Sequence, residues 1–295
     1  MNSSADDSLA SDVITSQAMV LIKGRFEDVP LSRRLPYHNS LHTNGVRQRA
    51  VEIARAMGLS EREVILTDIA AAFHDTVQVS HPVKKGNGVV VRQRHAGRNE
   101  LASAQEAVDA MGADSFSQMR FTPEEYGIVA SAIIATIPAW SGTFGTVIQP
   151  FLTPCSHPIV RAVALADLGA AGMDPACFAH DWPTLFAEDQ LDIMTALTNA
   201  KRASDINAAT QESYRKRYVW WIGSQAPFAR GRQALLSHEL EGLADTDARE
   251  RVRALFSHFD ESIQLATAAT KLAKTQDFVL LMRQLLPGAF PGEGR

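Results

Sequence analysis

The sequence predicts an all-α protein, a multi-helix bundle with additional helices toward its C-terminus. Three observations predict this class. Apolar residues recur with the period of a helix along most of the chain, and no segment keeps the apolar–polar alternation of a half-buried strand. Two long irregular stretches, 76–98 and 138–158, separate the helical patterns. Long loops inside a helical protein are often functional, so both stretches are candidates for that role.

The apolar periodicity predicts the helices in chain order, each bounded to within a few residues. They cover residues 12–23, 40–57, 61–75, 99–111, 123–137, 157–171, 189–223 with a break, 230–243, 247–272 and 275–286. Residues 64–73 are apolar almost throughout, so we expect their helix to be buried on most sides. A Gly-Asn-Gly turn at 86–88, followed by three valines, predicts a small hairpin inside the first irregular stretch.

The chain divides into three expected parts. Residues 1–12 are small and polar, with neither a basic nor an apolar region, which predicts a flexible tail and no leader peptide. Residues 13–200 form the core domain. Residues 201–295 continue as amphipathic helix without a linker or an internal repeat, so we expect a C-terminal helical extension packed on the core.

Composition narrows the class of partners. Apolar residues make up 45% of the 295, the formal charge is −4 and the pI is near 6.1, so no stable nucleic-acid partner is expected. The apolar runs are too short to cross a membrane. Cys155 and Cys177 match no thiolate metal spacing and pair only if the fold brings them together. We therefore expect a cytoplasmic protein without a membrane partner, and a homo-oligomer stays open.

The first candidate ligands lie in the segment YHNSLH at 37–42. His38 and His42 are four residues apart, so a helix that begins near residue 38 places both on one face. That face continues as an apolar stripe to Met57, and an imidazole buried there without a partner is costly. For either histidine alone, a hydrogen bond to a neighbouring carbonyl is the better explanation.

Two further segments place metal-ligand residues at buried positions. His74-Asp75 follows the apolar run 64–73 and offers an imidazole nitrogen and a carboxylate, which suit divalent metals. Asp167 lies on an apolar helical stripe, where either a metal ion or a salt bridge would offset its charge. Three helices thus carry ligand-type residues in the order His, His-Asp, Asp, a set that packing alone explains poorly. A second pair, His180-Asp181, lies in a polar connecting segment and is interpreted as unrelated.

This order of residues resembles the HD superfamily of metal-dependent phosphohydrolases. YHNSLHTNGV at 37–46 is similar to the first metal motif of its cyclic-nucleotide phosphodiesterase branch, and AAFHDTV at 71–77 is similar to the HD motif itself. ALADLGAAG at 164–172 resembles the segment with the last aspartate ligand, and NELASA at 99–104 resembles the NE-x-x-SA segment of small bacterial HD proteins. The resemblance covers about residues 35–175 and implies an HD-domain bundle in the core domain.

The resemblance also implies a ligand set for a divalent ion, with Mn, Mg, Fe, Zn and Ni all left open. The implied ligands are His42, His74, Asp75 and Asp167. One ion is expected and a second stays open, because the phosphodiesterase branch has another histidine soon after HD, whereas here His81 lies further on.

Three residues receive catalytic roles from the same resemblance. His38 corresponds to the histidine that protonates the leaving oxygen, and Asp75 is expected to orient or deprotonate the attacking water. Glu100 either points at the site as a base or second-metal ligand, or is a surface residue that favours the helix N-terminus. Both readings of Glu100 stay open at this point.

The expected function is hydrolysis of a phosphate mono- or diester, with a nucleotide among the candidates. The basic stretch 76–98 follows the HD pair directly, so its cations are expected to hold a small phosphorylated substrate, with a merely solvated basic surface as the alternative. These cations are Lys84, Lys85, Arg92, Arg94 and Arg98. Two rival functions are an HD-like di-iron oxygenase and a catalytically silent module that senses a nucleotide. The Trp220-Trp221 pair is expected to anchor helix packing.

Overall fold

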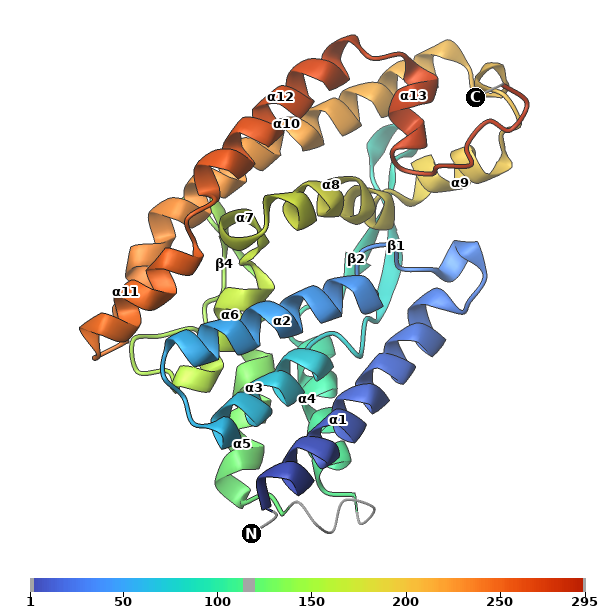
Figure 1. Cartoon of the computed structure of the whole chain (residues 1–295). Coiled ribbons are helices and arrows are strands. Elements are labelled where there is room, and N and C mark those ends of the chain that lie inside the picture. The colour runs from blue at the N-terminus through green and yellow to red at the C-terminus, as the bar shows by residue number, and fades with distance from the viewer. Residues whose placement is uncertain (1–2, 114–119, 294–295) are drawn as a thin grey trace.

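Helices dominate the computed structural model, which describes residues 3–113 and 120–293 (Figure 1). The N-terminal part contains α1 (Ser3–Ile22), α2 (Ser40–Ala56), α3 (Glu61–Phe73), α4 (Arg98–Met111), α5 (Pro123–Ile134) and α6 (Pro158–Asp167). The predicted all-α class is confirmed. Residues 3–12, which we expected as a tail, belong to α1.

Helix α3 is the centre of the N-terminal bundle. Ser60 caps it, with the Glu63 side chain returning to the Ser60 backbone, so the start of the helix is fixed locally. Eight of its residues from Val64 to Phe73 are buried, and α3 packs against α1, α2, α4, α5 and α6. The prediction that this helix is buried on most sides is therefore confirmed, and its C-terminal end is held rigidly inside the bundle.

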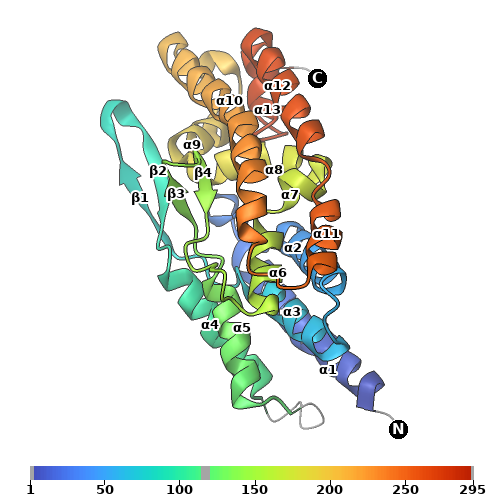
Figure 2. The same cartoon turned by 90° about the vertical axis from the view of Figure 1, so that its left-hand side faces the viewer.

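Two small antiparallel hairpins interrupt the helices. The first pairs β1 (Ser80–Lys84) with β2 (Val90–Arg94), as the Gly-Asn-Gly turn predicted, and Asn87 at the turn has a φ of 60°. The second pairs β3 (Ala139–Ser141) with β4 (Thr146–Ile148). Figure 2 shows both hairpins on the same flank of the molecule.

The C-terminal part differs from its predicted boundaries. It contains α7 (Ala170–Met173), α8 (Pro175–Asp189), α9 (Leu191–Asn199), α10 (Ala208–Glu239), α11 (Thr246–Leu255), α12 (Phe259–Thr275) and α13 (Phe278–Arg283). α10 continues through Pro227, where two helices were predicted, and runs alongside α12 (Figure 1). The single helix predicted over 247–272 is divided between α11 and α12.

Helix α10 belongs to two hydrophobic cores. Its first half contributes Tyr218 and Ile222 to a smaller core with α9 and α13. Its second half contributes Ala229 and Leu236 to the main core around α3. Gly172 in α7 lets α7 approach the C-terminal helices closely, since a Cβ there would meet Phe256 and Phe259 rings at 2.7 Å. The residues beyond 200 are thus packed into the main core at one end.

Two expectations concern membrane crossing and the state of the two cysteines. No helix in the described ranges is both long and apolar enough to cross a membrane. Cys155 is exposed and Cys177 is half-buried, and within the described chain both are free thiols.

Candidate metal centre

The candidate ligands come from the ends of three helices that meet inside the main bundle. His42 lies in the first turn of α2, His74 and Asp75 follow α3, and Asp167 is the last residue of α6. α2 packs against both α3 and α6, and α3 packs against α6. Helix packing therefore brings together residues that are up to 125 positions apart in the chain.

The start of α2 is set by Asn39. Its side-chain oxygen accepts hydrogen bonds from the backbone N–H groups of Leu41 and His42, which caps the helix. The helix begins at Ser40, so the expectation that His38 and His42 share a helical face is wrong: His38 precedes the cap. The two imidazole rings still lie close, with centroids 5.9 Å apart, because the chain turns back at the cap.

The last ligand depends on a tight end to α6. Asp167 is followed by a turn in which the Gly169 N–H donates to the Ala166 carbonyl. A Cβ at Gly169 would lie 2.5 Å from the Leu165 carbonyl oxygen, so only glycine fits this turn. The buried Arg49 side chain also donates to the Ala166 carbonyl, at 2.9 Å. Both contacts hold the backbone beside Asp167.

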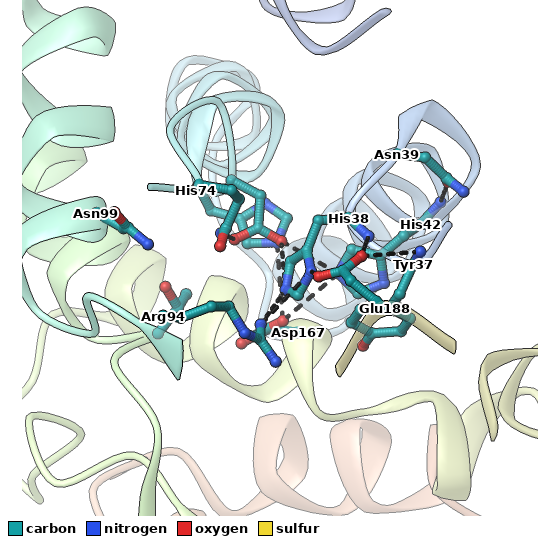
Figure 3. Close-up of polar contacts among 12 residues, drawn as sticks. Tyr37, His38, Asn39, His42, His74, Arg94, Asn99, Asp167 and Glu188 are labelled. Carbon is teal, nitrogen blue, oxygen red and sulfur yellow. Dashed lines mark hydrogen bonds and ion pairs between the residues drawn. The ribbon is translucent and has the colours of Figure 1, made fainter. Parts of the chain in front are cut away.

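The side chains of His42, His74 and Asp167 lie close together (Figure 3), and Asp75 lies against both histidines. Asp75 Oδ2 lies 3.0 Å from His74 Nε2 and 3.4 Å from His42 Nε2. Asp167 Oδ1 lies 3.7 Å from His74 Nε2 and 3.9 Å from His42 Nε2. The ligand atoms of His42, His74 and Asp75 all lie within 4.8 Å of one another, and the three residues are buried. This spacing is compatible with a shared ion.

The hydrogen bonding of His74 indicates why a cation fits there. Its Nδ1 lies 2.7 Å from the Ala71 carbonyl oxygen, which can only accept, so Nδ1 carries the proton. The Nε2 lone pair then faces two carboxylates, and among the described residues none forms a hydrogen bond with this atom. A lone pair aimed at carboxylates is repulsive unless a proton or a metal ion lies between them.

The pKa values of His74 and Asp75 reflect the same unfavourable electrostatics. Burial lowers the pKa of His74, but the Asp75 and Asp167 carboxylates outweigh it and raise that pKa to about 9. Burial raises the pKa of Asp75, but the neighbouring imidazoles of His74, His38 and His42 hold it well below its usual range. The site therefore strongly favours positive charge between these groups, which a divalent ion supplies.

Two glutamines orient the carboxylates. Gln78 donates to Asp75 Oδ1 at 2.7 Å, and Gln149 donates to Asp167 Oδ2 at 3.1 Å. Each carboxylate thus has one oxygen held by an amide and the other oxygen turned to the histidines. Such outer partners fix the orientation of metal ligands.

His38 lies between a buried glutamate and an arginine (Figure 3). Its Nδ1 is 2.5 Å from Glu188 Oε1, and its Nε2 is 2.5 Å from Arg94 Nη1. Arginine can only donate, so Nε2 accepts and Nδ1 carries the proton. Glu188 Oε2 also accepts from the backbone N–H groups of Tyr37 and His38, at 3.1 Å each. Burial raises the pKa of Glu188, but His38, through its ring and its backbone N–H, and Arg94 lower it to about 2.

The NELASA segment holds the loop that follows the HD pair. Asn99 accepts from the Val79 N–H and donates to the Val79 carbonyl, and Ser103 accepts from the Val77 N–H. Glu100 is buried, so its surface interpretation is wrong; Glu100 Oε2 accepts from the Gly97 N–H at the start of α4. Burial raises the pKa of Glu100, whose side chain also lines the cavity described next.

A cavity of about 1140 Å³ is lined by three of the four candidate ligands, His42, Asp75 and Asp167. Residues of α4, α7, α8, α10 and α12 and of the β3–β4 hairpin also belong to its described lining. α8 was not predicted: His180-Asp181 belongs to this helix and not to a connecting segment. His180 is exposed, whereas Asp181 lines the cavity and burial raises its pKa. Asp181 therefore belongs with the site.

The five cations predicted to bind the substrate lie in different places. Arg94 lines the cavity, while Arg92 donates to the Glu188 carbonyl and to Ser80 and so anchors the hairpin. The other three, Lys84, Lys85 and Arg98, are exposed and lie outside the cavity lining formed by the described residues. The basic stretch therefore brings one arginine to the candidate metal centre.

Two histidines and two tryptophans complete the placement of the residues singled out from the sequence. His81 lies on β1, exposed, with its Nδ1 2.8 Å from His95 Nε2. Trp221 donates to the Trp182 carbonyl at 2.8 Å, as expected for a packing anchor, whereas Trp220 is 71% exposed. Both tryptophans line the cavity.

Comparisons with family models, with curated proteins and with solved structures found no match to this chain.

Proposed function

We propose that this chain is a metal-dependent phosphohydrolase that acts on a phosphate mono- or diester. The observation that carries this proposal is the convergence of two imidazole Nε2 atoms and two carboxylates beside a large cavity, with the His74 lone pair facing those carboxylates. His42, His74, Asp75 and Asp167 would hold the ion. A divalent ion bound there would polarise a phosphoryl oxygen and lower the pKa of a water molecule toward neutrality.

The side chains around this set would supply orientation. Gln78 keeps Asp75 Oδ1 occupied, so only Oδ2 faces the histidines, and Gln149 does the same for Asp167. One free oxygen on each aspartate could therefore accept a proton from the attacking water. Glu100 lines the same cavity as a third carboxyl group, and its raised pKa favours a proton-carrying role more than that of a permanently charged ligand.

Arg94 and His38 would act as a pair on the phosphate. Arg94 Nη1 now donates to His38 Nε2, which leaves His38 without a proton on the nitrogen that faces Asp75, 3.9 Å away. A phosphoryl oxygen that takes over the Arg94 donor would free His38 Nε2 to carry a proton. Glu188, at Nδ1, would stabilise the resulting imidazolium and keep the ring in place. His38 could then donate its Nε2 proton to the leaving oxygen.

The test is a hydrolysis screen of phosphomonoesters and of cyclic and linear phosphodiesters, with Mn²⁺, Mg²⁺ or Zn²⁺ added to chelator-treated protein. We expect at least one ester class to turn over in a metal-dependent manner and the Asp75→Asn variant to lose that turnover. The His258→Ala variant is the control, because His258 is exposed and does not belong to the described lining of the cavity. Absence of turnover for every ester and metal, with the ion bound, would overturn the proposal.

A further inference from the structure

One part of the cavity lining, here called the wall, is apolar. It is built by side chains of α8 and α10, namely Phe178, Trp182, Leu185, Val219, Trp221 and Phe228. Phe178 packs edge-on against Trp182, with ring centroids 5.3 Å apart, and stacks on Phe228 at 5.9 Å. These contacts preform the wall, so an apolar group can bind there without ordering new side chains.

The charges that face the cavity are mainly negative. Its described lining contains five carboxylates, which are Asp75, Glu100, Asp167, Asp181 and Asp189. The lysine or arginine side chains in this lining are Arg94 and Lys274. Arg94 already faces Asp189 at 3.9 Å, and Lys274 is exposed at the end of α12. A bound divalent ion and Arg94 together could hold one phosphoryl group, while the remaining carboxylates keep the rest of the lining negative.

A substrate with several phosphates would therefore meet repulsion from the remaining carboxylates of the lining. Asp181 and Asp189 line the cavity from α8, and Asp189 already faces Arg94. Each additional phosphate would place negative charge near these carboxyl groups. The volume of about 1140 Å³ also exceeds what a phosphate group alone occupies, so most of the space is available to the ester-linked body.

We infer that the substrate is an amphiphilic phosphate ester, with a single phosphoryl group at Arg94 and the ligand set and an apolar aryl or alkyl body against the wall of α8 and α10. This inference rests on the proposed function and specifies its substrate class. A substrate with an apolar body would contact Leu185 and Phe228, whereas a substrate with a chain of phosphates would make no such contact.

Calorimetric titration with phosphonates, whose P–C bond resists hydrolysis, tests the inference independently of turnover. The titrations use the full chain with bound Mn²⁺ and compare methylphosphonate, hexylphosphonate and naphthylmethylphosphonate. We expect the hexyl and naphthylmethyl compounds to bind at least tenfold more tightly than the methyl compound, because their bodies bury apolar surface. Methylenediphosphonate should bind no more tightly than methylphosphonate. Equal affinities for all three monophosphonates, or tighter binding of the diphosphonate, would overturn the inference.

A matched pair of variants tests where the apolar part of the substrate binds. Leu185→Gln places an amide on the wall and should weaken naphthylmethylphosphonate about tenfold while leaving methylphosphonate unchanged. Leu265→Gln, on the exposed side of α12, should change neither affinity. Loss of both affinities in Leu185→Gln, with its thermal melting curve unchanged, would contradict the placement. Tighter binding of the phosphonates with apolar bodies, without hydrolysis of any ester, would support the apolar pocket and overturn only the proposed hydrolysis.

Discussion

Replacing Glu188 by glutamine should destabilise the protein in a pH-dependent way. The Glu188 carboxylate is 1% exposed and accepts hydrogen bonds from the backbone N–H groups of Tyr37 and His38, while its other oxygen holds the His38 ring. Glutamine keeps the shape of the side chain but removes the negative charge and turns an NH₂ group toward one of these donors. The segment that precedes α2 would then lose its anchor on α8.

The magnitude follows from the pKa of this carboxyl group. Burial raises that pKa, but His38 and Arg94 lower it from the ordinary 4.5 to about 2, which corresponds to about 3 kcal/mol of folding free energy at pH 7. Because the folded-state pKa is depressed, this contribution is complete above about pH 4.5 and is lost as the pH falls toward 2. For a chain of this length, it corresponds to a melting temperature lower by roughly 5–10 °C.

Urea unfolding of both proteins at pH 7 and at pH 3, followed by circular dichroism, measures this contribution. The difference in unfolding free energy between wild type and Glu188→Gln should be about 3 kcal/mol at pH 7 and about half of that at pH 3. Glu241→Gln is the control, since Glu241 is exposed and its loss should cost less than about 0.5 kcal/mol. The same difference at both pH values, or none at pH 7, would refute the argument that the charge of Glu188 anchors His38.

Three further predictions concern individual contacts. Gln149→Ala should weaken Mn²⁺ binding by about 10- to 100-fold in calorimetry, because Asp167 loses the amide that orients it; an affinity within twofold of wild type would argue against this role. Asn99→Ala should lower the free energy of unfolding by about 1–3 kcal/mol in urea titration, since the Val79 N–H loses its partner and the Val79 carbonyl keeps only the His95 N–H, and an unchanged midpoint would show that the loop is held elsewhere. Arg94→Ala should raise KM for a phosphate ester at least tenfold, and a loss confined to kcat would contradict a role in phosphate binding.

The positions of the candidate ligands could be predicted because local sequence and helix packing agree. The apolar run before His74 predicts a buried helix, and the apolar stripe around Asp167 predicts a carboxylate that faces the core; both helices lie where that pattern requires. Asn39 is a residue type that often caps helices, so α2 could be expected to begin just after it. That signal was outweighed by the four-residue spacing of the histidines, which suggested a helix from residue 38.

Glu188 and Gln149 could not be predicted, because their function depends on distant partners. Glu188 contacts His38 across 150 positions of sequence, and nothing in its own segment distinguishes it from the acidic residues beside it. Gln149 lies in a proline-rich stretch without periodicity, 18 residues before Asp167. Such contacts follow only from the way the helices pack, which local propensity does not determine.

The missed helix α8 did carry a local signal. Asp174 caps it through the Cys177 N–H, and Pro175 occupies its first turn, a combination typical of helix starts. Pro183 inside the helix and the polar pair before Trp182 made the segment resemble a loop. Because α8 supplies Asp181, Glu188 and part of the apolar wall, this error concealed these residues from sequence reasoning.

Metal binding by the Asp75→Asn variant tests the central claim most directly. Chelator-treated wild type and variant are titrated with Mn²⁺ in a calorimeter, and elemental analysis of the dialysed proteins counts the bound ions. We predict one tightly bound divalent ion per chain in the wild type, and binding at least 100-fold weaker in Asp75→Asn, whose helical circular dichroism stays unchanged. A wild type that binds no divalent ion, or a variant that binds it as tightly as the wild type, would contradict a metal centre built from His42, His74, Asp75 and Asp167.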